Sequence, residues 1–145
     1  NGSTGAGIWA TRIAGTAFEN GYGITVDSSN NIIVTGSYAS NPVTIYNAPG
    51  TSGTLTLLNS GFSNAFIVKY NSTGAGMWAT RIAGNADENG IDVAVDSINN
   101  IIVTGSYQAS PVTIYNADGK ISTTLLNSGS ADVYIVKYNA NGFAN

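Results

Sequence analysis

The sequence has no cysteine and no histidine, and only 9 % of its 145 residues are charged. A small domain without cysteine gains its stability from packing or from association with other chains rather than from disulfides. The absence of histidine and cysteine also removes the usual general base and the thiol nucleophile of enzymes. These absences make an enzyme the least favoured class of function, and no cofactor is expected.

The sequence is also poor in basic residues and in long apolar runs. Its five Lys and Arg residues are scattered, and the net charge is −3. Binding to nucleic acid needs a cluster of basic side chains that neutralises phosphates, and binding to a membrane surface needs a basic amphipathic segment. No apolar run approaches the 18 residues of a membrane span. We therefore expect neither nucleic acid nor a membrane as a partner.

What the chain does contain is typical of an all-β protein. It has 18 Gly and 8 Tyr, and its polar surface must come from Ser, Thr and Asn because charged residues are few. Such a composition favours strands joined by many turns. The runs of Ala, Leu, Glu and Lys that build helical bundles are missing.

A tandem repeat is the strongest signal in the sequence. Residues 3–71 align with residues 72–139, with one deletion near Thr56, and 47 of the 68 aligned positions are identical. Self-similarity of this strength indicates a repeat architecture.

Within each repeat the apolar residues alternate with period 2, which predicts strands. "GYGITVD" places Tyr22, Ile24 and Val26 on one face. "NIIVTGSY" is apolar on both faces at its start, as in a strand covered on both sides. Further strands are expected in "FIVKY" (66–70) and "MWATRIA" (77–83). Each repeat is thus predicted to be a four-stranded antiparallel unit with strands a, b, c and d.

The connections between these strands carry turn residues. "DSSNN" and "DSINN" join strands a and b, and their Asp and Asn side chains bond their own backbone and tolerate positive φ. The long connection 39–63 contains two short strand-like pieces, "VTIY" and "LTLL". We expect it to form an extra hairpin that projects from one rim of the unit.

Four-stranded units in tandem indicate blades of a β-propeller. The segments "GYGITVDSSNNIIVTGSY" and "NAFIVKYNSTGAGMWATRIAG", with their second copies, resemble the bacterial β-propeller repeat family known as SBBP. Blades of that family share G-x-G-I-x-V-D-x-x-x-N-x-x-V-T-G followed by F-x-x-K and a Trp. This chain departs from it at Asn30, where the family usually has Gly, and at Asp92, which replaces another Gly. The resemblance implies a propeller fold and little about function.

The order of the strands along the chain is d, then a-b-c-d, then a-b-c. We assign residues 1–15 to the outermost strand of a blade completed by another copy, 16–84 to blade 1 and 85–145 to blade 2. The prediction is that Ile8–Gly15 pairs with Val133–Tyr138 of another copy. The closure residues are Ile8, Trp9, Ile13, Val133, Tyr134, Val136 and Tyr138.

The partner expected from this strand order is therefore the chain itself. A head-to-tail contact that closes gives a cyclic oligomer. Because propellers have about 4–8 blades, a trimer or tetramer is favoured over a dimer. The alternative is that the chain is a two-blade part of a longer propeller.

Candidate sites are weak. Four charged pairs recur at equivalent positions, which suits structural roles: Arg12/Arg81, Glu19/Glu88, Asp27/Asp96 and Lys69/Lys137. Asp27, Ser29 and Asn31 alternate like the oxygen ligands of a calcium loop. A turn stabilised by the Asp side chain explains them better, because Ile98 replaces Ser29 in the second copy.

Glu19 and Asp27 could form the carboxylate pair of a glycosidase, but both recur in each blade.

The preferred function is a non-enzymatic propeller module that acts as an interaction scaffold. The alternative is a multivalent lectin-like protein that binds glycans, because sugars stack on aromatic rings and bond amides. The candidate ligand-binding residues lie in the inserted hairpins: Tyr46, Asn47, Tyr115 and Asn116.

Overall fold

The computed structural model describes residues 4–144, and the regular structure of these residues consists of twelve strands. They are β1 (Ile13–Ala14), β2 (Glu19–Val26), β3 (Ile32–Tyr38), β4 (Val43–Asn47), β5 (Ser52–Leu57), β6 (Asn64–Tyr70), β7 (Gly76–Ala83), β8 (Glu88–Val95), β9 (Ile101–Tyr107), β10 (Val112–Tyr115), β11 (Ile121–Leu125) and β12 (Asp132–Tyr138). Residues 4–144 contain no helix that could cross a membrane. The predicted all-β class is confirmed.

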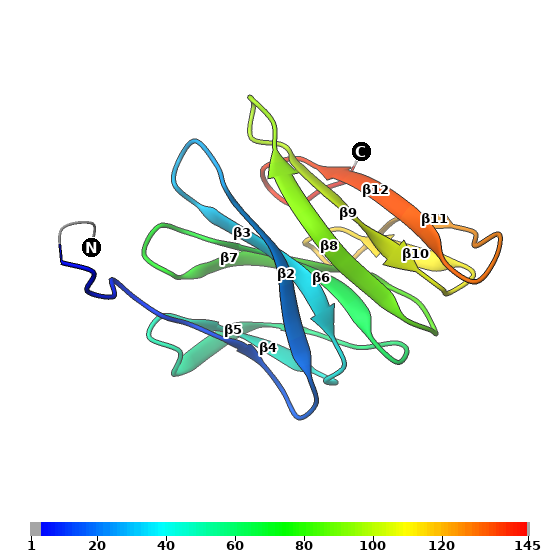
Figure 1. Cartoon of the computed structure of the whole chain (residues 1–145), viewed down its shortest axis with the longest axis horizontal. Coiled ribbons are helices and arrows are strands. Elements are labelled where there is room, and N and C mark those ends of the chain that lie inside the picture. Colours follow the sequence, from blue (N-terminus) through cyan, green and yellow to red (C-terminus); the bar gives the residue numbers. More distant parts are fainter. Residues whose placement is uncertain (1–3, 145) are drawn as a thin grey trace.

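The strands form three sheets in which neighbouring strands are antiparallel (Figure 1). The largest has six strands in the order β11-β10-β7-β6-β3-β2. Two three-stranded sheets have the orders β1-β4-β5 and β12-β9-β8.

The predicted order a-b-c-d is found in the first repeat. Strands β2, β3, β6 and β7 are adjacent in that order. The central pairing of β3 with β6 runs without interruption from Ile32↔Tyr70 to Tyr38↔Asn64. In the second repeat, β8, β9 and β12 take the places of a, b and c.

The inserted hairpins do not project from a rim, and this expectation was wrong. The hairpin of β10 and β11 pairs with the outer edge of β7 through Thr113↔Ala83 and Ile114↔Ile82. Strand β4 pairs in the same way with β1, which precedes it. The physical reason is that an outermost strand has a row of unpaired N–H and C=O groups, and an adjacent strand satisfies them. The division at residues 84 and 85 therefore separates repeats of the sequence, whereas one sheet contains strands from both.

The turns between strands a and b have the geometry that their sequence predicts. The Asp27 carboxylate accepts hydrogen bonds from the backbone N–H groups of Ser29 and Asn31, both at 2.9 Å. Asn30 has a φ of 60°. Its copy Asn99 has a φ of 65°, a conformation that Asn tolerates better than most residues.

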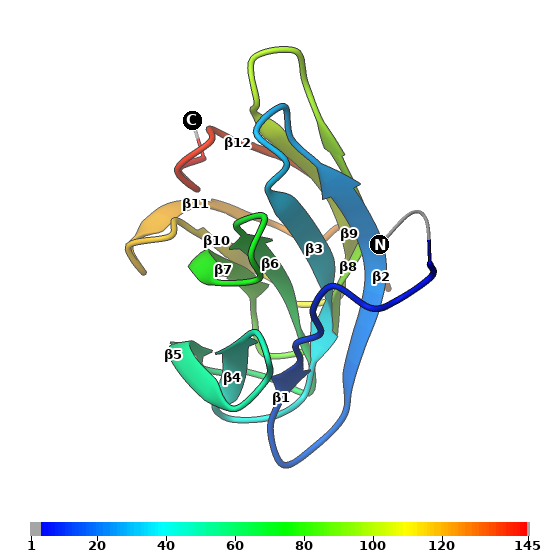
Figure 2. The ribbon, with the colours of Figure 1, turned by 90° about the vertical axis from the view of Figure 1, so that its left-hand side faces the viewer.

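The six-stranded sheet has a hydrophobic core on each face. On one face, Ile33, Ile67 and Ile82 pack against the sheet of the second repeat (β8, β9 and β12). On the opposite face, Phe66 and Val68 pack against the β4–β5 hairpin. Figure 2 shows this layering, with β8 and β9 beside β2 and β3 and with β4 and β5 on the other side. All seven residues of β6 are consequently buried.

Candidate functional site

The outer edge of β12 is open. Strand β12 lies at the end of its sheet and pairs with β9. Its side chains alternate, so that Tyr134 is buried while Val133 and Ile135 are 72 % and 75 % exposed. At its last residue the edge is covered, because Ala144 forms a bridge with Tyr138. The open edge therefore runs from Val133 to Lys137.

Strand β6 contains the same I-V-K-Y motif as β12, but it is paired on both edges and buried on both faces. It pairs with β3 on one side and with β7 on the other. Ile67 of β6 is fully buried, whereas the equivalent Ile135 of β12 is the exposed residue described above. Among residues 4–144, β12 has no strand on its second edge and no sheet that covers Ile135.

Strand β1 is likewise paired on one edge. It pairs with β4 through Ile13↔Ile45 and Ala14↔Thr44, and its other edge has no strand among the described residues. Ile82↔Ile114 joins β7 to β10 in the equivalent register. The segment before β1 is held in place by Trp9, whose indole N–H donates to the carbonyl of Ser72 at 3.1 Å. Ile8 is 79 % exposed.

Within one chain the structure does not bring the predicted closure residues together. Ile8, Trp9 and Ile13 lie on one side of the six-stranded sheet, while Val133 lies in the sheet on its other side. The side chains of Tyr134, Val136 and Tyr138 point into the core between the two repeats. These three residues could contribute backbone groups at the edge, but not exposed side chains.

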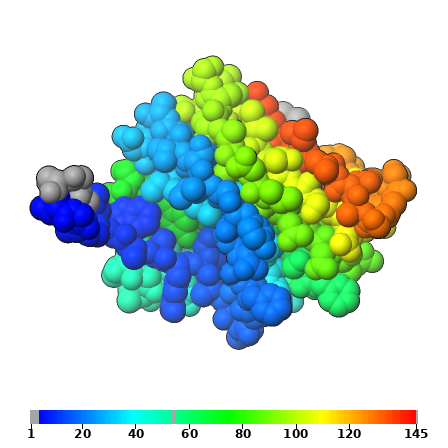
Figure 3. Space-filling view, viewed as in Figure 1, coloured from blue at the N-terminus to red at the C-terminus, as the bar shows by residue number. Residues whose placement is uncertain are grey.

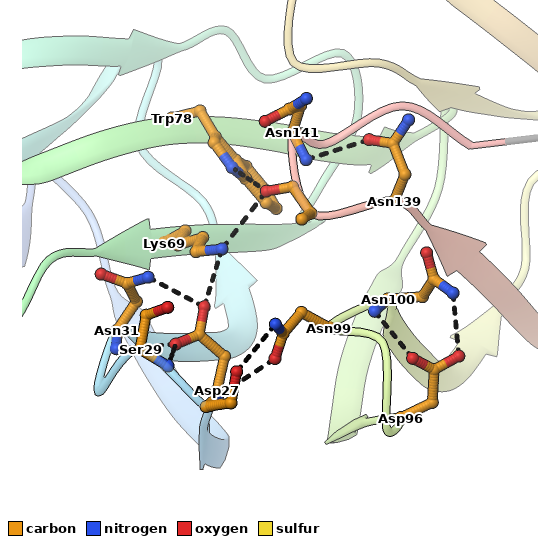
Figure 4. A network of polar contacts seen from close by, with 12 residues as sticks. Asp27, Ser29, Asn31, Lys69, Trp78, Asp96, Asn99, Asn100, Asn139 and Asn141 are labelled. Carbon is orange, nitrogen blue, oxygen red and sulfur yellow. Dashed lines mark hydrogen bonds and ion pairs between the residues drawn. The ribbon is translucent and has the colours of Figure 1, made fainter.

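The recurring Asp and Lys residues form ion pairs in both repeats. Lys69 Nζ lies 2.9 Å from Asp27 Oδ2, with 4 % and 3 % of the two side chains exposed. Lys137 Nζ lies 2.8 Å from Asp96 Oδ2, but here 54 % and 23 % are exposed. Lys69 also donates to the carbonyl of Ala140 at 3.3 Å, and Figure 4 shows its ammonium group beside the Asp27 carboxylate. The second ion pair thus lies beside the unpaired edge of β12 and is more exposed to solvent than the first.

These ion pairs set the acidity of both carboxyls. Burial favours the neutral acid of Asp27, but hydrogen bonds from Asn31 and Lys69 outweigh it and lower the pKa of Asp27 from 3.8 to about 2. Hydrogen bonds from Lys137 and Asn100 likewise lower the pKa of Asp96.

The carboxylate of Asp27 is engaged by partners within the chain. It accepts four hydrogen bonds: two backbone bonds from Ser29 and Asn31, one from the Asn31 amide at 2.9 Å, and one from Lys69. Residues 4–144 contain no group of three His, Cys, Asp or Glu side chains that could hold a metal. The geometry is that of the turn favoured in the sequence analysis.

The carboxylates of Glu19 and Asp27 are far apart. Glu19 begins β2 and Asp27 follows its last residue, which places them roughly 25 Å apart at about 3.3 Å per residue. Glycosidase carboxylates lie within about 10 Å of each other. Glu88, the copy of Glu19, is completely buried and accepts bonds from Gly84 and Asn64. Burial raises the pKa of Glu88, and its role is to hold the loop before β8.

The hairpin residues proposed for a glycan are engaged in contacts within the chain. The Arg12 guanidinium lies 4.3 Å from the ring centre of Tyr46, and Arg81 lies 4.4 Å from that of Tyr115. Asn47 accepts a hydrogen bond from the N–H of Gly76. Asn116 accepts one from Ala144. One face of each tyrosine and the oxygen of each amide are therefore occupied.

The sequence patterns did not predict two features of the structure: the pairing of the inserted hairpins and a contact between two turns. They did not predict that the hairpins extend the sheets, although "VTIY" has the alternation of a paired strand. They also missed the contact between turns, in which Asn99 Nδ2 donates to Ser28 Oγ at 2.8 Å and Ser28 N–H donates to Asn99 Oδ1. Figure 4 shows Asn99 directed toward the turn that contains Asp27. The recurrence of Ser and Asn in both turns was the available signal.

Comparison with known proteins supports the repeat type. No family model and no solved structure matches the chain, so membership of the SBBP family stays a prediction. An uncharacterized WD repeat-containing protein (L264) of Acanthamoeba polyphaga mimivirus is 36 % identical over 137 residues. The match covers 94 % of this chain, and the chain spans about a tenth of the relative's length. The chain is thus similar, over nearly all its residues, to part of a WD repeat-containing protein, which supports a β-propeller type of repeat.

Proposed function

We propose that this chain is a non-enzymatic β-propeller repeat module that assembles head to tail into a ring and serves as an interaction scaffold. The observation that carries the proposal is the contrast between β6 and β12. Both strands contain I-V-K-Y, but β6 is paired on both edges and β12 on one. An open strand edge with exposed apolar side chains favours pairing with another chain.

The internal contact between the repeats provides a template for the contact between copies. The β6–β7 register pairs Ala65 with Ile82 and Lys69 with Trp78. The equivalent pairs between copies are Val133 with Ile13 and Lys137 with Trp9. The hairpin on β1 would then extend the sheet of β12, as the β10–β11 hairpin extends that of β6.

Further contacts follow from the same template. Lys137 would donate to the carbonyl of Ser72 in the next copy, as Lys69 does to Ala140. Ile24 of β2, which is 69 % exposed, would be covered like its buried equivalent Val93. Burying one such side chain fully contributes about 1.5–3 kcal/mol. Several of them offset the cost of association.

The contact between copies differs from the template at one position. A Cβ atom added at Gly23 would lie 2.9 Å from the Cα of Asp92, so the two repeats approach each other closely there. Asp92 itself is the residue equivalent to Gly23, and its side chain would face the next copy. The contact between copies must therefore be wider at this point.

A second candidate is favoured by the comparison. Because the mimivirus relative is about ten times longer than the match, the two blades could belong to a longer propeller. The same edges would then be completed by neighbouring blades of one polypeptide. The scaffold function is common to both candidates.

The experiment is the molar mass in solution by light scattering coupled to size exclusion. The proposal expects three or four times the mass of the chain, which corresponds to six or eight blades. Deleting residues 1–15 should yield monomers, with circular dichroism as the check on folding. A stable monomer of the full chain contradicts assembly, and an unchanged oligomer after the deletion contradicts strand donation.

A further inference from the structure

A cavity of about 400 Å³ lies where the ends of β2 and β8 meet the loop before β6. Three aromatic residues line it: Phe18, Tyr22 and Phe62. Their side chains are 75 %, 55 % and 77 % exposed. Figure 3 shows β2 and β8 side by side on this face of the molecule.

The fold does not require these aromatic side chains. The equivalent residues of the second repeat are Asp87, Ile91 and Ser130, and β8, β9 and β12 form there in the same order. Seven residues of the first repeat line the cavity, and five of them differ in the second: Phe18, Tyr22, Ala39, Phe62 and Ser63. Across the whole alignment only 21 of 68 positions differ. The two repeats therefore differ more often at this cavity than along the alignment as a whole.

Polar groups of the cavity are available to a ligand. The side-chain amides of Asn20 and Asn89 line it and make no hydrogen bond with any residue between 4 and 144. Asp87 is held by Ser63, whose hydroxyl donates to Asp87 Oδ1 at 2.8 Å. An amide offers a donor and an acceptor side by side, which matches neighbouring hydroxyl groups.

We propose that this cavity binds a neutral saccharide. The apolar C–H face of a sugar packs on exposed aromatic rings, and its hydroxyls bond amides and a carboxylate. The lining contains Asp87 but no Lys or Arg, so it does not suit a phosphate or another anion. All the lining residues belong to one chain, so the site does not depend on assembly.

The test is saturation-transfer difference NMR with a panel of neutral sugars: glucose, galactose, mannose, N-acetylglucosamine and their common disaccharides. The proposal expects transfer to the C–H protons of at least one of them, with an affinity measurable by titration. The triple variant Phe18→Asp, Tyr22→Ile and Phe62→Ser introduces the residues that the second repeat carries. We expect it to fold and to lose at least tenfold in affinity.

Two further variants distinguish binding in the cavity from nonspecific binding to exposed aromatic residues. Asn20→Ala should lower the affinity for the sugar severalfold, because it removes an amide that has no partner within residues 4–144. Phe143→Ser changes an exposed aromatic outside the cavity and should leave the affinity unchanged. The proposal is overturned if no sugar shows transfer, if the triple variant binds as before, or if Phe143→Ser causes the same loss. A changed molar mass of the triple variant without sugar binding in the parent would instead identify the aromatics as a contact between copies.

Discussion

Lys69 and Asp27 form an ion pair in which Nζ lies 2.9 Å from Oδ2 and both side chains are almost completely buried. Their copies, Lys137 and Asp96, form the same pair at 2.8 Å in a partly exposed position. The chain therefore contains one interaction in two environments.

The first prediction compares the two lysines. Lys69→Met leaves the Asp27 carboxylate buried without its cation, which is expected to lower the free energy of unfolding by about 3 kcal/mol. Both variants are compared in the chain without residues 1–15, which the proposal expects to be monomeric. There Lys137→Met should change the free energy of unfolding little, because no other copy covers Asp96 and water reaches it. Urea denaturation followed by circular dichroism measures both. If both variants lost the same free energy of unfolding, the two ion pairs would not differ in burial as the structure indicates.

The second prediction concerns acid stability. The folded state holds the pKa of Asp27 at about 2, below its ordinary 3.8. A lowered pKa contributes stability that is present above pH 4 and is lost as the pH falls toward 2, by about 2 kcal/mol in all. Unfolding free energies at pH 4.5, 3 and 2 should fall in this order. In Asp27→Asn this part of the pH dependence should be absent, and an unchanged slope would show that another group causes it.

A third prediction uses two equivalent glycines. A Cβ atom at Gly90 would lie 2.1 Å from Thr35 Oγ1, whereas one at Gly21 would have no atom within 4 Å. Gly90→Ala should therefore destabilise the chain by about 1–3 kcal/mol. Gly21→Ala should leave the chain stable but weaken assembly, because the template places Thr104 of another copy against it. Denaturation and light scattering report the two effects separately.

Sequence patterns predicted the strands and their order because a strand's period and its turn residues are local. "FIVKY" alternates, and Asp27 and Asn31 mark a turn wherever the chain lies. The β10–β11 hairpin pairs with the edge of β7, some 30 residues earlier in the chain. No local sequence pattern indicates with which strand the hairpin pairs. The aromatic cavity was missed for the same reason, since Phe18 and Phe62 are far apart in the sequence and adjacent only in the fold.

The fourth prediction tests the open edge of β12. Ile135→Lys places a charge on an exposed side chain, so the single chain should remain folded. At a strand edge a lysine opposes pairing with another chain, and the oligomer should dissociate to monomers. Ile121→Lys, on the exposed outer strand β11, is the matched control and should keep the parent mass. An oligomer that survives Ile135→Lys would exclude this edge from the contact.

The last prediction concerns Asp92, which takes the place of a glycine at a point where the two repeats approach each other closely. Its side chain is exposed in the single chain, so Asp92→Gly removes no buried contact. Glycine in a strand costs about 0.5–1 kcal/mol in conformational entropy, and the chain should become slightly less stable. If copies meet as the two repeats do, the variant should nevertheless associate more tightly, because the backbone of the next copy can approach as closely as β8 approaches Gly23. Dilution of the parent and the variant, followed by light scattering, compares their dissociation. Tighter association of a less stable chain is the pattern that only a contact at Asp92 produces, and weaker association would show that the copies do not meet through this face.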